Sequence, residues 1–262
     1  MMERVTAQSI HVGEALIRRD VARRVYFAFG PMLRALRHCR PVVAADATFL
    51  TGAFPSTLYA IVGKDANNQL VPAAFMLAWS AERMEDWKPF LQLFQPMMSH
   101  VRICISDAAK GLPEAIEEVG WRHSRCARHM YGNMQTAGIA RGVAAADVCN
   151  LAKLCCPAHF HYVLGVIESK NKDAAAFLRA KQEEYSAVTF LPEYPRFGDA
   201  LNNMAEQFNS ILVRDAPGQL AIKDMGWISI IAALRRHMHK WHTARYGALP
   251  LTPFPLGTPD AM

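Results

Sequence analysis

The sequence predicts an α/β fold built on a mixed sheet, and three observations carry that prediction. Three apolar segments of strand length, 41–52, 57–63 and 70–79, follow one another across short turns, which is typical of an antiparallel meander. A fourth segment, 101–106, alternates apolar and polar residues and passes directly into a helical pattern, as strands of parallel sheets do. A helical block from about 134 to 190 then separates these strands from two later helices.

The 262 residues have the composition of a globular protein, since 52% are hydrophobic and 20% are charged. This length suffices for one elaborated domain or for a domain with a helical annex. The net charge of +6 is compatible with a polyanionic partner, but many enzymes share such an excess. No apolar run reaches the ~18 residues of a membrane helix and the N-terminus lacks a signal-peptide core, so we expect an intracellular protein without membrane contact. The six cysteines indicate reduced thiols rather than a disulfide framework.

Helical patterns account for most of the remaining chain. Residues 1–39 are predicted to form a helical lead-in, because apolar residues recur among arginines through 13–39. The Pro-rich end, 247–262, is predicted to be a disordered tail. Further helices are expected at 82–98, at 109–119, from 202 or 203 onward, and at 227–246, with a short strand at 122–125.

Three carboxylates occupy positions that favour chemistry. Asp46 lies within an apolar strand, where an unpaired charge costs several kcal/mol. Asp107 ends the fourth strand, and Glu206 shares with Asn202 and Asn209 a helix face that has no Lys or Arg. Two Asp and one Glu that converge are ligands Mg²⁺ and Mn²⁺ prefer, and two such ions can cleave or join phosphodiesters. The alternatives are a structurally paired Asp46 and an Asp107 that caps the following helix.

Each of these carboxylates lies within a short motif, and a fourth motif begins at Cys126. Glu82 and a Trp-x-x-Phe-Leu helix at 87–91 lie between the first two motifs. The four motifs are Asp46-Ala47-Thr48-Phe49-Leu50-Thr51-Gly52, Ser106-Asp107-Ala108-Ala109-Lys110-Gly111-Leu112, Cys126-Ala127-Arg128-His129 with Asn133 after it, and Asn202-Asn203-Met204-Ala205-Glu206-Gln207-Phe208-Asn209-Ser210. Each motif alone is common, but in this order and spacing the sequence resembles the Mutator-like element (MULE) transposases, over roughly residues 20–245.

The resemblance implies the RNase H-like fold of DDE transposases: three antiparallel strands, then parallel strands, flanked by helices, with an all-α insertion before the last catalytic helix. It implies a catalytic domain over 40–246, with the insertion at about 134–190. Asp46, Asp107 and Glu206 would be the catalytic triad and would hold two Mg²⁺ or Mn²⁺ ions. DNA, as transposon ends and as target, would be the partner. The active form would be a homo-oligomer, and the protein would be nuclear.

Cys126 and His129 form a Cys-x-x-His motif, to which the resemblance gives a structural or DNA-end-positioning role. Zinc is the competing interpretation, because Cys156 and His159 supply a second Cys-x-x-His and zinc accepts all four ligands. We favour the first interpretation, since the segment after Cys156 has the pattern of ordinary helix packing.

Several basic residues are candidates for contacting DNA, and a solvated basic helix face is the alternative for the last three. The candidates are Lys110, Arg125, Arg128, Arg235, Arg236 and Lys240.

Three functional hypotheses follow. The leading one is a DNA transposase catalytic domain that performs metal-dependent cleavage and strand transfer at transposon ends. Relatives usually carry DNA-binding segments outside this domain, and no Cys-rich module precedes residue 20 or follows residue 246, so we expect a truncated element or a standalone domain. The second hypothesis is a domesticated or inactive transposase-derived DNA-binding regulator. The third, another RNase H-like nuclease, accounts less well for the motif around Glu206.

Overall fold

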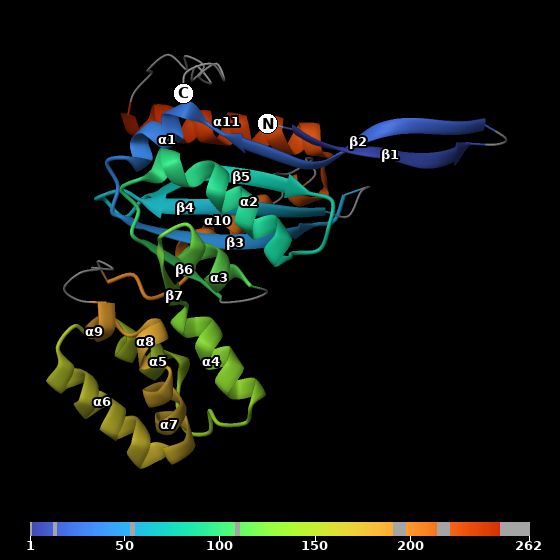
Figure 1. The fold of residues 1–262 in the computed structure, drawn as a ribbon. Helices are drawn as coiled ribbons and strands as arrows, with labels where there is room; N and C mark the ends of the chain where they lie inside the picture. Colours follow the sequence, from blue (N-terminus) through green and yellow to red (C-terminus); the bar gives the residue numbers. More distant parts are fainter. Residues whose placement is uncertain are drawn as a thin grey trace.

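A seven-stranded mixed sheet forms the centre of the protein, with strand order β1-β2-β5-β4-β3-β6-β7 (Figure 1). The computed structural model describes residues 2–12, 15–52, 56–107, 111–190, 198–213 and 221–246, and side chains from residue 22 onward. The strands are β1 (Met2–Val12), β2 (Ala15–Ala28), β3 (Val42–Leu50), β4 (Ser56–Lys64), β5 (Leu70–Ala78), β6 (Ile103–Ser106) and β7 (Arg122–Arg125). No helix in these ranges is both long enough and apolar enough to span a membrane.

The predicted fold class is confirmed. Strands β3, β4 and β5 pair in antiparallel order, β6 pairs in parallel with β3, and β7 pairs in parallel with β6. The helices between and after the strands are α1 (Gly30–Leu36), α2 (Met84–Phe94), α3 (Leu112–Glu118), α10 (Asn203–Val213) and α11 (Trp227–Tyr246), with short 3₁₀ turns at Gln95–Met98 and Ile222–Asp224.

The predicted helical lead-in over 1–39 is wrong. Residues 2–12 and 15–28 form two long strands that pair with each other, and of the described residues up to 39 only Gly30–Leu36 form a helix. The end of β2 pairs with β5 from Arg24 to Ala28, and its Val-Tyr-Phe run has high strand propensity. The free edge of β5 therefore decides the conformation, because backbone pairing there outweighs the helix-like spacing of the arginines. The hairpin extends well beyond the rest of the sheet (Figure 1).

Helices cover both faces of the sheet, with α2 on one face and α10 on the other (Figure 1). Tyr59 of β4 packs edge to face against Trp87 of α2, with ring centroids 4.7 Å apart. On the opposite face Phe75 of β5 packs against Phe208 of α10 at 5.4 Å. Both faces of the central strands are thus apolar, which explains the nearly continuous hydrophobic runs of β4 and β5.

An all-α segment separates β7 from α10, as predicted. It contains α4 (Ala127–Thr136), α5 (Ala145–Lys153), α6 (Pro157–Lys170), α7 (Lys172–Ala180), α8 (Gln182–Tyr185) and α9 (Ala187–Phe190). These helices enclose a second hydrophobic core, in which Phe160 and Leu178 are buried. The limits of 40 and 246 for the catalytic domain stay predictions, and the predicted tail at 247–262 lies outside the described residues.

A buried ion pair joins the edge strand β2 to α2. Arg24 Nε donates to Asp86 Oδ1 at 2.7 Å, and the other oxygen of Asp86 accepts from Ser80 Oγ at 2.7 Å and from Tyr59 OH at 3.2 Å. Asp86 is only 2% exposed. A buried carboxylate with this many donors is well satisfied, and the loss of its charge removes the anion that Arg24 Nε contacts.

We therefore predict that Asp86→Asn lowers the free energy of unfolding by about 3 kcal/mol in urea denaturation. Glu118→Gln is the matched control. Glu118 of α3 pairs at 2.7 Å with Lys88, which lies on α2 as Asp86 does, but both side chains of this pair are more than 40% exposed. That substitution should cost less than about 1 kcal/mol. Equal losses in the two variants would contradict a special role for the Arg24 pair.

Candidate active site

Strand register sets two of the predicted carboxylates side by side. In the parallel pair β3 and β6, Val42 lies opposite Ile103 and Ala44 opposite Ile105. Two residues further along both strands, Asp46 and Asp107 stand at equivalent positions. The charge of Asp107 acts on Asp46 strongly enough to raise its pKa, which agrees with this placement. Helix α3 has Gly111 as its N-cap, so the helix-capping role considered for Asp107 does not apply to α3.

Cys126 continues the same row on the next strand. Ser106 of β6 pairs with Arg125 of β7, and Cys126 N donates to Ser106 O at 2.8 Å. Asp107 directly follows β6 and Cys126 directly follows β7, so these two residues lie level with each other on neighbouring strands. The parallel part of the sheet presents two carboxylates and a thiol in sequence, where parallel strands deliver their side chains to a common site.

The surroundings of Asp46 disfavour its charged form. Burial raises the pKa of Asp46 to about 7, and the neighbouring charge of Asp107 adds to that effect. Asn209 of α10 offsets part of the cost, because its Nδ2 donates to Asp46 Oδ2 at 2.8 Å. The backbone of Ala47 also hydrogen-bonds to this carboxylate, but the pKa stays raised, so the half-buried site favours a proton or a cation.

Helix α10 contributes Glu206 through the polar face that the sequence indicated. Glu206 Oε2 accepts a short hydrogen bond from Arg128 Nη1 of α4. One turn earlier, Asn202 is fully buried, and its backbone N–H donates to Cys126 Sγ at 3.1 Å. The start of α10 is thus held against the junction of β7 and α4, so Glu206 faces the first turn of α4.

Cys126, His129 and Glu206 form a compact group, in which each offers a ligand atom within 4.8 Å of the other two. Interaction with the Cys126 thiol raises the pKa of His129 to about 9, and the charges of Asp107 and Glu206 contribute. Burial alone would raise the pKa of Cys126, but hydrogen bonding from His129 and from Asn202 N lowers it overall. A charged imidazole among the acidic residues partly neutralises them.

The predicted triad is not equally compact. Within the described ranges, the group of Cys126, His129 and Glu206 is the one set of three potential ligands this close together. Asp46 and Asp107 interact with each other, whereas Glu206 is directed toward Arg128 and His129. His129 links the two halves, because it interacts with all three carboxylates.

Residues 42–133 match the family model of the MULE transposase domain, about a third of the chain. The matched range contains Asp46, Asp107, Cys126 and His129, and it ends before Glu206. A search of curated proteins found no match. The resemblance seen in the sequence is thus confirmed over residues 42–133, which include β3 to β7 and the first turn of α4, and it supports a transposase-type function.

The other residues that the sequence singled out are distributed more widely. Arg125 forms an ion pair with Glu184 of α8 at 3.0 Å. Cys156 and His159 are exposed at the start of α6, outside the group that contains Cys126. Lys110 lies outside the described residues. Arg235, Arg236 and Lys240 are exposed on α11.

Two contacts of the site were not predicted from the sequence. Asn209 was placed on the polar face of its helix, but its hydrogen bond to Asp46 joins residues 163 positions apart. Arg128 was assigned to DNA, whereas here it holds Glu206. The absence of Lys and Arg from the helix face that carries Asn209 and Glu206 is the sequence feature that indicates the contact with Asp46. No sequence feature indicates the contact between Arg128 and Glu206.

The raised pKa of Asp46 predicts a pH-dependent cost in stability. The unfolded carboxyl titrates near pKa ~3.9, so between about pH 4 and 7 the folded protein binds more protons and rising pH lowers the free energy of unfolding. We predict that Asp46→Asn makes the metal-free protein more stable at pH 8 by about 2–4 kcal/mol, with little change at pH 4. Urea denaturation in EDTA measures this difference.

Asp173→Asn is the control, because Asp173 is an exposed aspartate near the start of α7. It should change stability by less than about 0.5 kcal/mol at either pH. A gain from Asp46→Asn that was the same at pH 4 and pH 8 would show that packing, rather than the buried charge, was responsible.

Proposed function

We propose that the chain is the catalytic core of a DNA transposase, which cleaves phosphodiesters at transposon ends and transfers the strands with Mg²⁺ or Mn²⁺. The observation that carries this proposal is the in-register placement of Asp46 and Asp107 on parallel strands inside the range that matches the MULE transposase domain. Helix α10 adds Glu206 from the face of the sheet that Asp46 occupies, as the contact between Asn209 and Asp46 indicates. The likeness to transposases supports the reaction class, and the carboxylates support a metal-dependent mechanism.

The residues present fit hard divalent cations. Carboxylate oxygen is the ligand that Mg²⁺ and Mn²⁺ prefer. Asp46 is half-buried, and both desolvation and the charge of Asp107 disfavour its ionised form. A cation would relieve both costs at once. Two bound ions would activate a water or a 3′-hydroxyl and stabilise the leaving oxygen.

The residues of the chain have separable roles in this proposal. Asp46 and Asp107 hold the metals from rigid strands, and Asn209 orients Asp46 through its hydrogen bond. Glu206 completes the ligand set from α10 once its carboxylate leaves Arg128, whose side chain is 53% exposed and can turn toward solvent or a phosphate. His129 stabilises the acidic cluster while no cation is bound.

We predict that the natural chain nicks supercoiled plasmid DNA with Mn²⁺ or Mg²⁺, and that Asp46→Asn, Asp107→Asn and Glu206→Gln each lower the rate by more than about 100-fold. Loss of a direct ligand should exceed the 10–100-fold typical of outer-shell changes. Gel analysis of nicked and linear products provides the measurement, and thermal unfolding with added Mg²⁺ reports binding independently.

Glu114→Gln serves as the control, since Glu114 is an exposed carboxylate of α3 and its loss should leave the rate unchanged. A folded natural chain that cleaves no DNA with either metal would contradict the proposal and favour the DNA-binding regulator instead. Cleavage that survives Asp107→Asn would show that the strand pair is not the metal site.

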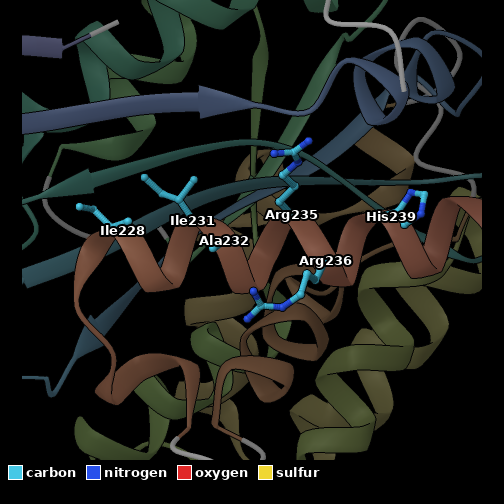
Figure 2. Close-up of a pocket in the computed structure, with 6 residues that line it drawn as sticks. All are labelled: Ile228, Ile231, Ala232, Arg235, Arg236 and His239. Carbon is cyan, nitrogen blue, oxygen red and sulfur yellow. The ribbon is translucent and has the colours of Figure 1, made fainter. Parts of the chain in front are cut away.

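The basic part of α11 is a candidate for binding DNA away from the carboxylates. Arg235, Arg236 and His239, with Ile228, Ile231 and Ala232, line a cavity of about 590 Å³ (Figure 2). Among the described residues, the lining comes from α11 and includes none of the three carboxylates. Figure 2 shows the two arginines projecting to different sides of the helix, which suits contacts to phosphates along a backbone rather than to one small anion.

We predict that replacing Arg235, Arg236 and Lys240 together with Gln weakens duplex DNA binding about 10-fold and lowers the salt slope by about 2–3. Fluorescence anisotropy across a salt series measures both quantities. The control replaces Arg37, Arg102 and Lys172 with Gln, which removes the same charge from exposed positions elsewhere. Equal effects of the two triple variants would indicate net charge rather than a binding surface. Nuclear location and assembly of several copies on DNA stay predictions from the family.

A further inference from the structure

The cluster at the start of α4 has an unusual composition for a site that handles Mg²⁺. Cys126 ends β7, His129 follows one helical turn later, and Glu206 approaches from α10, with all three ligand atoms within 4.8 Å of one another. A tetrahedral zinc site holds such atoms about 3.5 Å apart, given metal–ligand distances of 2.0–2.3 Å. A small contraction of the cluster would reach that geometry.

The surroundings of Cys126 and His129 favour a cation softer than Mg²⁺. Asn202 N already donates to Cys126 Sγ at 3.1 Å, an outer-shell contact that stabilises a thiolate. His129 Nδ1 is buried, and apart from the interaction of this imidazole with the Cys126 thiol it has no hydrogen-bond partner within the described structure. Zinc binds the deprotonated forms of a thiol and an imidazole, so a bound cation would take the place of their protons.

Thiolate, imidazole and carboxylate are together a ligand set that zinc accepts and that Mg²⁺ does not favour. We propose that Cys126, His129 and Glu206 form a binding site for a thiophilic divalent cation of the Zn²⁺ class, next to the Asp46 and Asp107 pair. This site differs from the four-ligand one considered in the sequence, because Cys156 and His159 take no part in it. Its fourth position is open to water.

Glu206 then belongs to two sites of different chemistry. Arg128 holds its carboxylate in the metal-free protein, and the exposed position of that guanidinium makes the contact easy to give up. A cation bound to Cys126 and His129 would keep Glu206 away from Asp46 and Asp107. This consequence, competition between Zn²⁺ and Mg²⁺ for Glu206, rests on the proposed function, whereas the thiolate site itself does not.

Co²⁺ titration of the full chain tests the site, because a cobalt–thiolate bond gives a near-ultraviolet charge-transfer band that oxygen ligands do not give. The natural chain should develop this band at one equivalent of Co²⁺, and one equivalent of Zn²⁺ should abolish it. Cys126→Ser should eliminate the band, and Glu206→Gln and His129→Gln should each weaken Co²⁺ binding by at least about 10-fold.

Cys156→Ser is the matched control, because Cys156 belongs to the other Cys-x-x-His of the chain and is exposed. It should keep the full band. No band in the folded natural chain, or a band that Cys156→Ser removes and Cys126→Ser does not, would overturn the inference. The plasmid assay is separate, so nicking without a thiolate band rejects this site alone, and a band without nicking rejects the proposed function alone.

Discussion

The parallel register of β3 with β6 is the constraint on which the rest of the site depends. It sets Asp46 level with Asp107, and the next pair of strands sets Asp107 level with Cys126. Side chains alternate between the faces of a strand, so a slip of one residue would turn Asp107 away from Asp46. The buried apolar residues on β3 and β6 fix that register, because Val43, Ala44 and Ile105 are fully buried. Packing of the core therefore determines where the charges meet.

The same register explains why the site is electrostatically costly. Core packing holds the carboxylates together, and among the groups that compensate them are Asn209 and the Ala47 backbone on Asp46, the imidazole of His129, and Arg128 on Glu206. None of these is an ideal partner for two adjacent carboxylates. Functional sites commonly retain such instability because binding relieves it. The stabilised parts of the molecule lie elsewhere, as the well-satisfied Arg24 and Asp86 pair shows.

The sequence was sufficient for features that depend on local pattern. The lone carboxylate in an apolar strand identified Asp46, the strand-to-helix transition identified Asp107, and the strand β7 was predicted with its observed limits. Features that depend on tertiary pairing were not predictable. Residues 15–28 have arginines at helix-like spacing, yet they join the sheet because β5 offers an open edge. The contact of Arg128 with Glu206 joins positions 78 residues apart, and no local pattern encodes it.

The helical segment with the second core positions the part of the site at which one carboxylate, that of Glu206, can change partners. Asp46 and Asp107 are fixed by strands of the sheet, but the first turn of α4 is anchored in the helical segment, where Ala127 and Met130 are buried. Two contacts tie this turn to the start of α10: Ala127 N donates to Ala200 O at 3.0 Å, and Asn202 N donates to Cys126 Sγ. Glu206 stands between the two units on a side chain with three rotatable bonds. Its carboxylate can thus change partners while both cores stay intact, which neither strand-borne aspartate can do as easily.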